Sequence, residues 1–271
     1  MQINKLYKIG LSIVGLLAMI ATGAFVWISF GTQATADPTK SGKASPKASE
    51  SAAAEPTLAE SLSPSPEAPL VFDHPGASQA AFGAVGVIPV FGSPGGAQTK
   101  TVKNPTVEGM QVVFGVKENR GEWLKVQLPS RPNGATGWVR KEHVLIKTVP
   151  NHIVVEVAKR KLSAFKGDKL LMEVPVGVGT AKTPTPIGNF YVDFSIRNPG
   201  SPYGAHMLSV AGFSNVLRNF GGGVGQIAIH GWGDDGSIGA FSSNGCLRLS
   251  NKDVVKLAGM AAPGTPVFVL P

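Results

Sequence analysis

Short apolar runs separated by Gly, Pro and Asn recur from residue 84 to the end of the chain, and this pattern constrains the fold more than any other feature. In residues 84–148 the runs include Val87–Phe91, Met110–Val116 and Trp123–Leu128. Runs of this length, bounded by turn residues, are typical of β-strands, and their close succession predicts a small barrel.

This stretch resembles the bacterial SH3-like domains, which often end in a Gly-Trp-Val strand like that at residues 137–139. Trp123 and Trp138 are candidates for a ligand platform. In so small a barrel, however, tryptophans more often fill the core.

Strand signals resume after Asn151 and continue to the end of the chain. The predicted strands are Ile153–Val157, Lys161–Phe165, Leu170–Val178, Phe190–Phe194, Gln226–His230 and Thr265–Leu270. One helix is predicted from Asn251 to about Met260, because Ser250 can cap it and Asp253 stands at the third helical position. The whole protein is therefore expected to be mainly β, with one or two helices.

The N-terminus predicts export. Residues 9–30 form an uncharged stretch of 22 residues preceded by Lys5 and Lys8. A membrane-spanning helix needs about 20 apolar residues, whereas the apolar region of a cleaved signal has about 7–15. Length favours a retained anchor with its lysines in the cytoplasm, and the alternative is a secreted protein cleaved near Ala36. Either interpretation places the chain after about residue 37 outside the cytoplasm.

Residues 37–70 contain 20 Ala, Ser or Pro among 34 positions and no aromatic residue. Such a segment cannot bury enough apolar surface to order itself, so we expect a flexible tether. The predicted organisation is an anchor or signal sequence at 1–32, a linker at 33–80, a β-barrel at 81–149 and a second β-rich domain at 150–271.

The net charge of the chain after residue 36 limits which binding partners are expected. After residue 36 the chain has 23 Lys and Arg against 17 Asp and Glu, a net charge of +6. This modest excess fits attraction to an anionic polymer such as a bacterial cell wall, or only solubility. No basic stripe with interleaved aromatics is present in the sequence, so nucleic acid is not expected as a partner.

Cys246 is the only cysteine in the chain. Exported proteins use cysteines in pairs, so a single one is an intermolecular link, a functional thiol or a small buried hydrophobe. A thiol becomes a good nucleophile beside a base, and His230 ends an apolar strand sixteen positions earlier.

The neighbours of Cys246 favour a functional thiol. Backbone N–H groups of Asn244, Gly245 and Cys246 can form an oxyanion hole. Arg248 alternates to the same side of an extended segment as Cys246, where it can bind a carboxylate or hold a thiolate in a positive field. Separately, each of these residues and His230 has an ordinary structural explanation, but together they indicate catalysis.

At these residues the sequence resembles the L,D-transpeptidase (YkuD-type) family. The family signature of His-Gly followed by Ser/Thr-x-Gly-Cys-x-Arg stands here as His230-Gly231 and residues 243–248. The earlier element Thr-Pro-x-Gly-x-Phe stands at residues 185–190. One common variant has His where this chain has Asn244. The resemblance covers about residues 151–271.

The resemblance implies a mixed β-sandwich catalytic domain that exchanges peptide bonds in peptidoglycan stem peptides. It makes Cys246 the nucleophile, His230 the base and the backbone carbonyl of Gly231 the third member. It further implies a 3→3 crosslink through a thioester, acylation of the cysteine by carbapenems, and no metal or organic cofactor. Arg248 and Ser243 belong to the motif as substrate-binding residues.

Tyr203, His206 and Trp232 are further candidates for lining the cleft, with ordinary loop residues as the alternative. Several other functions compete. The same Cys-His site serves an L,D-carboxypeptidase that uses water as acceptor. A further alternative is a wall-binding protein without catalytic activity. A sortase separates its Cys and Arg much further, and a papain-like amidase places Cys before His, so both fit less well.

Overall fold

The computed structural model describes residues 77–233 and 235–271. The predicted anchor at 1–32 and the predicted linker up to residue 76 lie outside the described residues. In the part of the chain that is described, no helix is long and apolar enough to cross a membrane.

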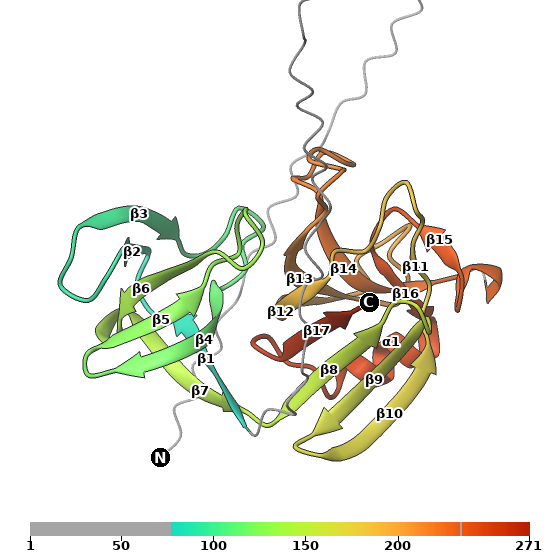
Figure 1. Ribbon diagram of the computed structural model, residues 1–271, viewed down its shortest axis with the longest axis horizontal. Helices are drawn as coiled ribbons and strands as arrows, with labels where there is room; N and C mark the ends of the chain where they lie inside the picture. Colours follow the sequence, from blue (N-terminus) through green and yellow to red (C-terminus); the bar gives the residue numbers. More distant parts are fainter. Residues whose placement is uncertain (1–76, 234) are drawn as a thin grey trace, which may run out of the picture. The chain divides into compact units, whose positions relative to one another are not determined.

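The first module, residues 78–149, is one antiparallel sheet (Figure 1). Its strands are β1 Ser78–Gly83, β2 Val87–Phe91, β3 Gln98–Lys103, β4 Val113–Arg120, β5 Trp123–Gln127, β6 Thr136–Arg140 and β7 Val144–Val149, in the order β3-β2-β6-β5-β4-β1-β7. Its core includes Ile88, Phe114 and Leu124, each fully buried. Trp138 is buried as well, whereas the half-buried Trp123 packs edge-on against Phe91.

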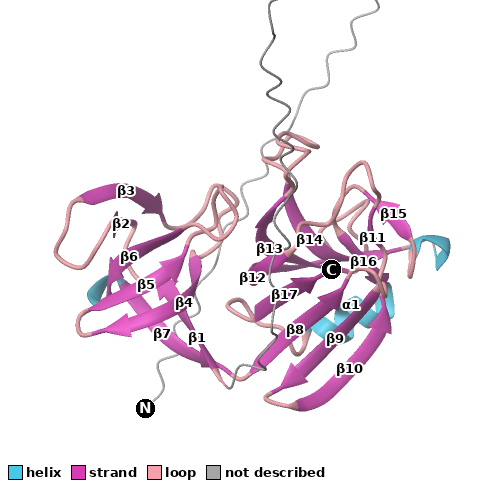
Figure 2. Ribbon diagram, viewed as in Figure 1, coloured by secondary structure: helices cyan, strands magenta, loops and turns pink. Residues whose placement is uncertain are grey.

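The second module, residues 151–270, is built on a mixed eight-stranded sheet with the order β10-β9-β8-β17-β12-β13-β14-β16. The strands are β8 Asn151–Glu156, β9 Lys161–Lys166, β10 Lys169–Pro175, β12 Gly188–Arg197, β13 His206–Phe213, β14 Gln226–Trp232, β16 Leu247–Ser250 and β17 Pro266–Leu270. A separate parallel pair joins β11 Val178–Gly179 to β15 Phe241–Ser243. Figure 2 shows how strongly strands dominate. The prediction of a mainly β protein is confirmed.

Strand β12 connects the two halves of the large sheet. Its residues 188–191 pair with β17, and its residues from Val192 onward pair with β13, with a register shift between Val192 and Phe194. A shift of this kind bends a strand. The two halves share one hydrophobic core, which includes the fully buried Leu208, Ile229 and Leu247.

Helix α1, Asn251–Ala258, begins where the sequence predicts. The Ser250 hydroxyl accepts a hydrogen bond from the Asp253 N–H at 3.0 Å and donates one to the Asp253 carboxylate at 2.7 Å. The cap is therefore confirmed, although the carboxylate binds the hydroxyl rather than the N-cap backbone. The buried Val254 and Leu257 pack the helix onto the core, where it contacts β13, β14 and β16.

Several strands were not predicted from the sequence, among them β1, β3 and β13. The predicted linker at 33–80 overlaps the start of β1. Strand β3 is exposed along most of its length, so it shows no apolar alternation. Strand β13 begins at His206, a candidate cleft residue for which the sequence analysis predicted no strand, and it lies between β12 and β14 in the large sheet.

Candidate active site

Cys246 lies in a tight turn between β15 and β16, which we call the cysteine turn (Ser243–Cys246). Gly245 has a φ of +112°, a conformation that side chains disfavour, so glycine is needed there. The Ser243 hydroxyl lies inside the turn, where it accepts a hydrogen bond from the Gly245 N–H at 3.0 Å and donates one to the Cys246 carbonyl at 2.6 Å. The turn is therefore held in one shape from within.

Thr185, the first residue of the Thr-Pro-x-Gly-x-Phe element, fixes the cysteine turn from outside. Its hydroxyl accepts from the Gly179 N–H at 2.9 Å and donates to the Gly245 carbonyl at 3.0 Å. The Thr183 hydroxyl donates to the Ser243 carbonyl at 3.2 Å. This explains why an element about 60 residues upstream belongs with the cysteine motif: the two are joined by hydrogen bonds.

His230 lies on β14, and its side chain is buried. Its Nδ1–H donates to the Gly231 carbonyl at 2.9 Å, because a carbonyl oxygen can only accept. In the neutral ring, Nε2 is then left without a proton and can act as a base. The rings of Tyr203 and Trp232 pack edge-on against the imidazole, with centroids 5.2 and 5.7 Å away.

Gly231 is required by close packing. A Cβ atom at this position would lie 2.3 Å from Oδ1 of Asn251 and 3.1 Å from the Ala205 backbone nitrogen. Asn251 uses the same Oδ1 to accept a hydrogen bond from the Ala205 N–H at 2.7 Å. The His-Gly pair thus places the histidine on a strand while leaving room for the first residue of α1.

A cleft of about 300 Å³ brings the predicted site residues together. Cys246, His230 and Asn244 line it, as do Tyr203 and Trp232. Of the three further candidates for the cleft wall, Tyr203 and Trp232 therefore line the cleft. His206 is not among the lining residues, and its Nε2 forms a hydrogen bond of 2.7 Å with the Ser195 hydroxyl.

Arg248 lies beside His230, because β14 and β16 run parallel with these two residues in register. Leu247 and Leu249 are fully buried, as strand alternation predicts, and Arg248 is half-buried. Its guanidinium donates to the Ser242 carbonyl at 3.1 Å and lies 3.7 Å from the centroid of the Trp232 ring. Trp232 lines the cleft, whereas Arg248 packs on the Trp232 ring and is not itself a lining residue.

The structure changes two expectations about the turn. The Gly245 N–H already donates to Ser243, so of the three predicted oxyanion-hole donors only the N–H groups of Asn244 and Cys246 stay candidates. Ser243 is 1% exposed and bonded on both sides, so it shapes the turn rather than contacting substrate.

Electrostatics favour a neutral thiol and a neutral imidazole at rest. Burial raises the pKa of the Cys246 thiol, and the smaller opposing effects of the Ala228 backbone hydrogen bond and the Arg248 charge do not cancel it. Burial also lowers the pKa of His230. The Arg248 charge lowers it further, whereas the hydrogen bond to the Gly231 carbonyl raises it by less than burial lowers it. Desolvation thus outweighs the effect of the Arg248 charge on the pKa of Cys246.

Sequence reasoning missed one wall of the cleft. It comes from the loop 214–225, through Phe220 and Val224 among others. The available signal was the glycine run at 221–223, followed by Gly225. Among residues 77–233 and 235–271, no group of three or more His, Cys, Asp or Glu side chains could hold a metal ion.

Known proteins resemble the second module. The family model of the L,D-transpeptidase catalytic domain (YkuD) matches residues 150–269, which include Cys246 and His230. The YkuD protein of Bacillus subtilis (strain 168) is 36% identical over 122 residues, which cover 45% of this chain and 67% of that protein. The chain belongs to the YkuD-type L,D-transpeptidase family.

Two further matches have lower sequence identity. The ErfK/SrfK protein of Escherichia coli (strain K12) is 28% identical over 158 residues, covering 51% of this chain and 50% of that protein. The solved structure of Bdellovibrio bacteriovorus Bd1075 matches with 26% identity and a TM-score of 0.36, over 45% of this chain and 47% of that one.

Proposed function

We propose that this family member is a peptidoglycan L,D-transpeptidase that uses Cys246 as its nucleophile. The observation that carries the proposal is the pairing in one cleft of the single thiol with His230, whose Nδ1 is held by Gly231. This arrangement leaves Nε2 as the only basic position of the ring, on the side away from Gly231.

The first half-reaction starts from neutral groups. His230 Nε2 takes the thiol proton as sulfur attacks the carbonyl of an L-centred residue in a donor stem peptide. The N–H groups of Asn244 and Cys246 stabilise the oxyanion. When the tetrahedral intermediate collapses, the amide bond to the terminal D-amino acid breaks, the imidazolium protonates the leaving amine, and a thioester remains on Cys246.

The second half-reaction reverses these roles. The amine of a neighbouring stem attacks the thioester while His230 Nε2 takes its proton. The carbon–sulfur bond breaks, and the imidazolium returns the proton to the sulfur of Cys246. A 3→3 crosslink forms when both stems carry a diamino acid at position three. Water in place of the amine would instead give an L,D-carboxypeptidase.

Arg248, Tyr203 and Trp232 are proposed to hold the substrate. Trp232 and Tyr203 flank the imidazole at the cleft wall, where flat rings can pack against a stem peptide. Arg248 lies over Trp232 and would bind a substrate carboxylate with its planar, two-pronged donor.

We further propose that the protein works outside the cytoplasm, tethered through residues 9–30. The alternative is a secreted form cleaved near Ala36. In either form, acylation of Cys246 by carbapenems is expected, because a β-lactam carbonyl can take the place of the donor carbonyl.

The decisive experiment is mass spectrometry of purified muropeptides after incubation with the full-length protein. The expected product is a crosslinked dimer that has lost one terminal D-amino acid. Tripeptide without dimer would identify the carboxypeptidase. Unchanged muropeptides, together with no carbapenem adduct on Cys246, would leave only the wall-binding function.

A further inference from the structure

The loop 214–225, which joins β13 to β14, forms one wall of the catalytic cleft. Its residues Phe220 and Val224 line the cleft, yet they are 51% and 56% exposed. Exposed apolar side chains beside a reactive thiol are available to contact a substrate. The position of this wall therefore matters for how a stem peptide binds.

The loop is ordered locally at its tip and its base. Phe220 and Gly223 exchange backbone hydrogen bonds of 3.0 and 2.9 Å at the tip. At the base, the Ser214 N–H donates to the Gly225 carbonyl at 2.8 Å, and its hydroxyl accepts from the Leu217 N–H at 3.0 Å. These bonds define the shape of the loop but do not attach it to anything else.

The attachment comes from Arg131, a residue of the first module. Its Nη1 donates to the Val224 carbonyl at 2.6 Å, and its Nη2 donates to the carbonyls of Ser214 at 2.8 Å and Leu217 at 3.4 Å. The guanidinium also lies 5.1 Å from the centroid of the Phe213 ring. One planar cation thus joins the outgoing and returning stems of the loop.

Asn133 adds a second attachment two residues later. Its Nδ2 donates to the Phe213 carbonyl at 2.8 Å, and its Oδ1 accepts from the Phe213 N–H at 2.9 Å. The side chain therefore pairs with the last residue of β13 as a neighbouring strand would. Arg131 and Asn133 together fix the point where the loop leaves the sheet.

The two modules are also joined elsewhere, so this attachment is not what holds them together. The Gln127 side-chain amide donates to the Asn189 carbonyl at 2.8 Å, and the buried Tyr191 hydroxyl donates to the Gln127 carbonyl at 3.3 Å. The first module even reaches the cleft itself, since Glu108 is one of its lining residues.

We propose that Arg131 and Asn133 are positioning residues of the active site, through which the first module holds the loop 214–225 in the conformation that receives a stem peptide. The inference rests on the proposed function for its substrate. It gives the first module a part in substrate binding that is separate from any affinity for the cell wall.

The test compares Arg131→Ala, Arg131→Lys and Asn133→Ala with a matched control, Arg120→Ala, in the full-length protein. Arg120 belongs to the same module, lies over Trp138, and has a 64% exposed side chain paired with Glu118. Lysine at 131 keeps the charge but presents its donors from one nitrogen, without the planar fork that spans both stems of the loop, so it is not expected to restore the wild-type behaviour.

Three measurements separate positioning from general damage. Tryptic cleavage after Arg218, within the loop, is expected to accelerate in the Arg131 and Asn133 variants, because the loop opens more often. The KM for the donor stem is expected to rise about tenfold, as for a displaced binding group. Alkylation of Cys246 by iodoacetamide is expected to stay at the wild-type rate, since the thiol and His230 are held by other contacts.

Unchanged cleavage and unchanged KM in Arg131→Ala would overturn the inference, and so would equal effects in Arg120→Ala. If Arg131→Ala does not fold, Asn133→Ala and Arg131→Lys decide by the same criteria. Failure of the proposed function would look different: the wild type itself would convert no stem peptide, while the cleavage comparison would still report on the attachment.

Discussion

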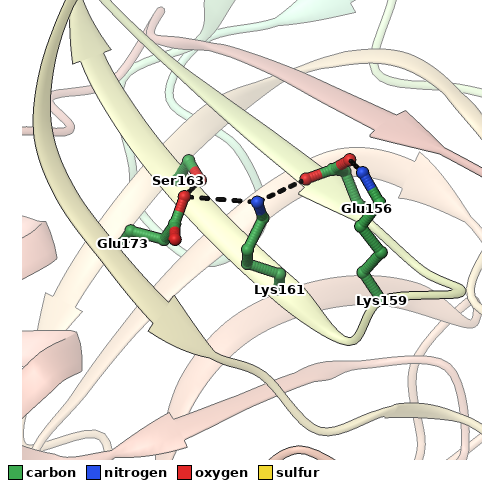
Figure 3. A network of polar contacts seen from close by, with 5 residues as sticks. All are labelled: Glu156, Lys159, Lys161, Ser163 and Glu173. Carbon is green, nitrogen blue, oxygen red and sulfur yellow. Dashed lines mark hydrogen bonds and ion pairs between the residues drawn. The ribbon is translucent and has the colours of Figure 1, made fainter.

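Two polar clusters of the second module use the same kinds of bonds in opposite surroundings. The cysteine turn and its brace are buried, with Ser243 and Thr185 only 1% and 2% exposed. The charged residues of the cluster around β8, β9 and β10, which we call the lysine network, are partly exposed to solvent, and the Lys159 side chain is 67% exposed. Figure 3 shows the lysine network, whose members are Glu156, Lys159, Lys161, Ser163 and Glu173.

The different burial of the two clusters indicates which hydrogen bonds matter for function. In the lysine network, Lys161 pairs with Glu156 at 3.0 Å and with Glu173 at 3.3 Å, but water can replace either partner. In the cysteine turn a lost partner leaves a buried polar group unsatisfied, which costs about 1–3 kcal/mol. Burial therefore makes the turn rigid, and exposure leaves the network replaceable.

The largest effect is expected from Cys246→Ser in the buried cluster. A hydroxyl is far less acidic than a thiol, so His230 activates it much less effectively in a site built around sulfur, and turnover of stem peptides should disappear. Thermal stability should stay near the wild-type value because the two side chains have similar size. The assay is muropeptide mass spectrometry with a thermal melt as control, and crosslinking at the wild-type rate would exclude Cys246 as nucleophile.

The second effect is expected from His230→Ala, with a fall of roughly 10²–10⁴ in the rate of Cys246 acylation by a carbapenem at pH 7. In the wild type, the lowered pKa of His230 keeps the imidazole neutral on mild acidification. The rate should therefore hold as pH falls through about 6.5, the ordinary value for histidine, and drop only below it.

The His230→Ala variant should behave differently with pH. Without a base, reaction depends on the thiolate, whose formation is delayed by the raised pKa of Cys246. Its acylation rate should climb steadily as pH rises above neutral. A variant with the wild-type rate and pH profile would show that another group activates the sulfur.

A smaller effect is expected from Thr185→Val, which removes the brace while nearly preserving shape. The Gly179 N–H and the Gly245 carbonyl lose their buried partner. Unfolding free energy should fall by about 1–3 kcal/mol, and kcat should fall as the cysteine turn loosens. Chemical denaturation and acylation kinetics measure the two, and Thr180→Val, at a half-buried hydroxyl bonded to Thr183, is the matched control.

The smallest effect is expected from Lys161→Met in the lysine network. The pKa of Lys161 is raised mainly by its hydrogen bond to Glu156, but the side chain is 33% exposed, so water can replace the lost contacts. Neither Tm nor acylation rate should change measurably, and any difference should vanish in high salt. A loss of stability as large as that of Thr185→Val would erase the distinction between the two clusters.

Sequence reasoning worked where a local pattern carries the information. Ser250 and Asp253 located the start of α1, and Leu247 and Leu249 showed which face of β16 is buried. It ended the helix near Met260 rather than at Ala258, a difference within the last turn. The pairing of Cys246 with His230 came from a motif.

What could not be predicted depends on contacts between distant segments. The role of Thr185 appears only when its hydroxyl meets the Gly245 carbonyl. The resting charge of Cys246 depends on burial, which outweighs the charge that the sequence displays at Arg248. Arg131 has no local signal at all, because its three acceptors lie 83 to 93 residues away.

Cys246 is the only cysteine among 271 residues, so each chain carries one thiol that can be counted by a chemical reagent. A denatured sample treated with a thiol reagent counts every chain. A folded sample treated with a tight acylating inhibitor counts only chains whose cleft is intact. The ratio of the two counts is the competent fraction of a preparation, so rate constants for any variant can be stated per working molecule.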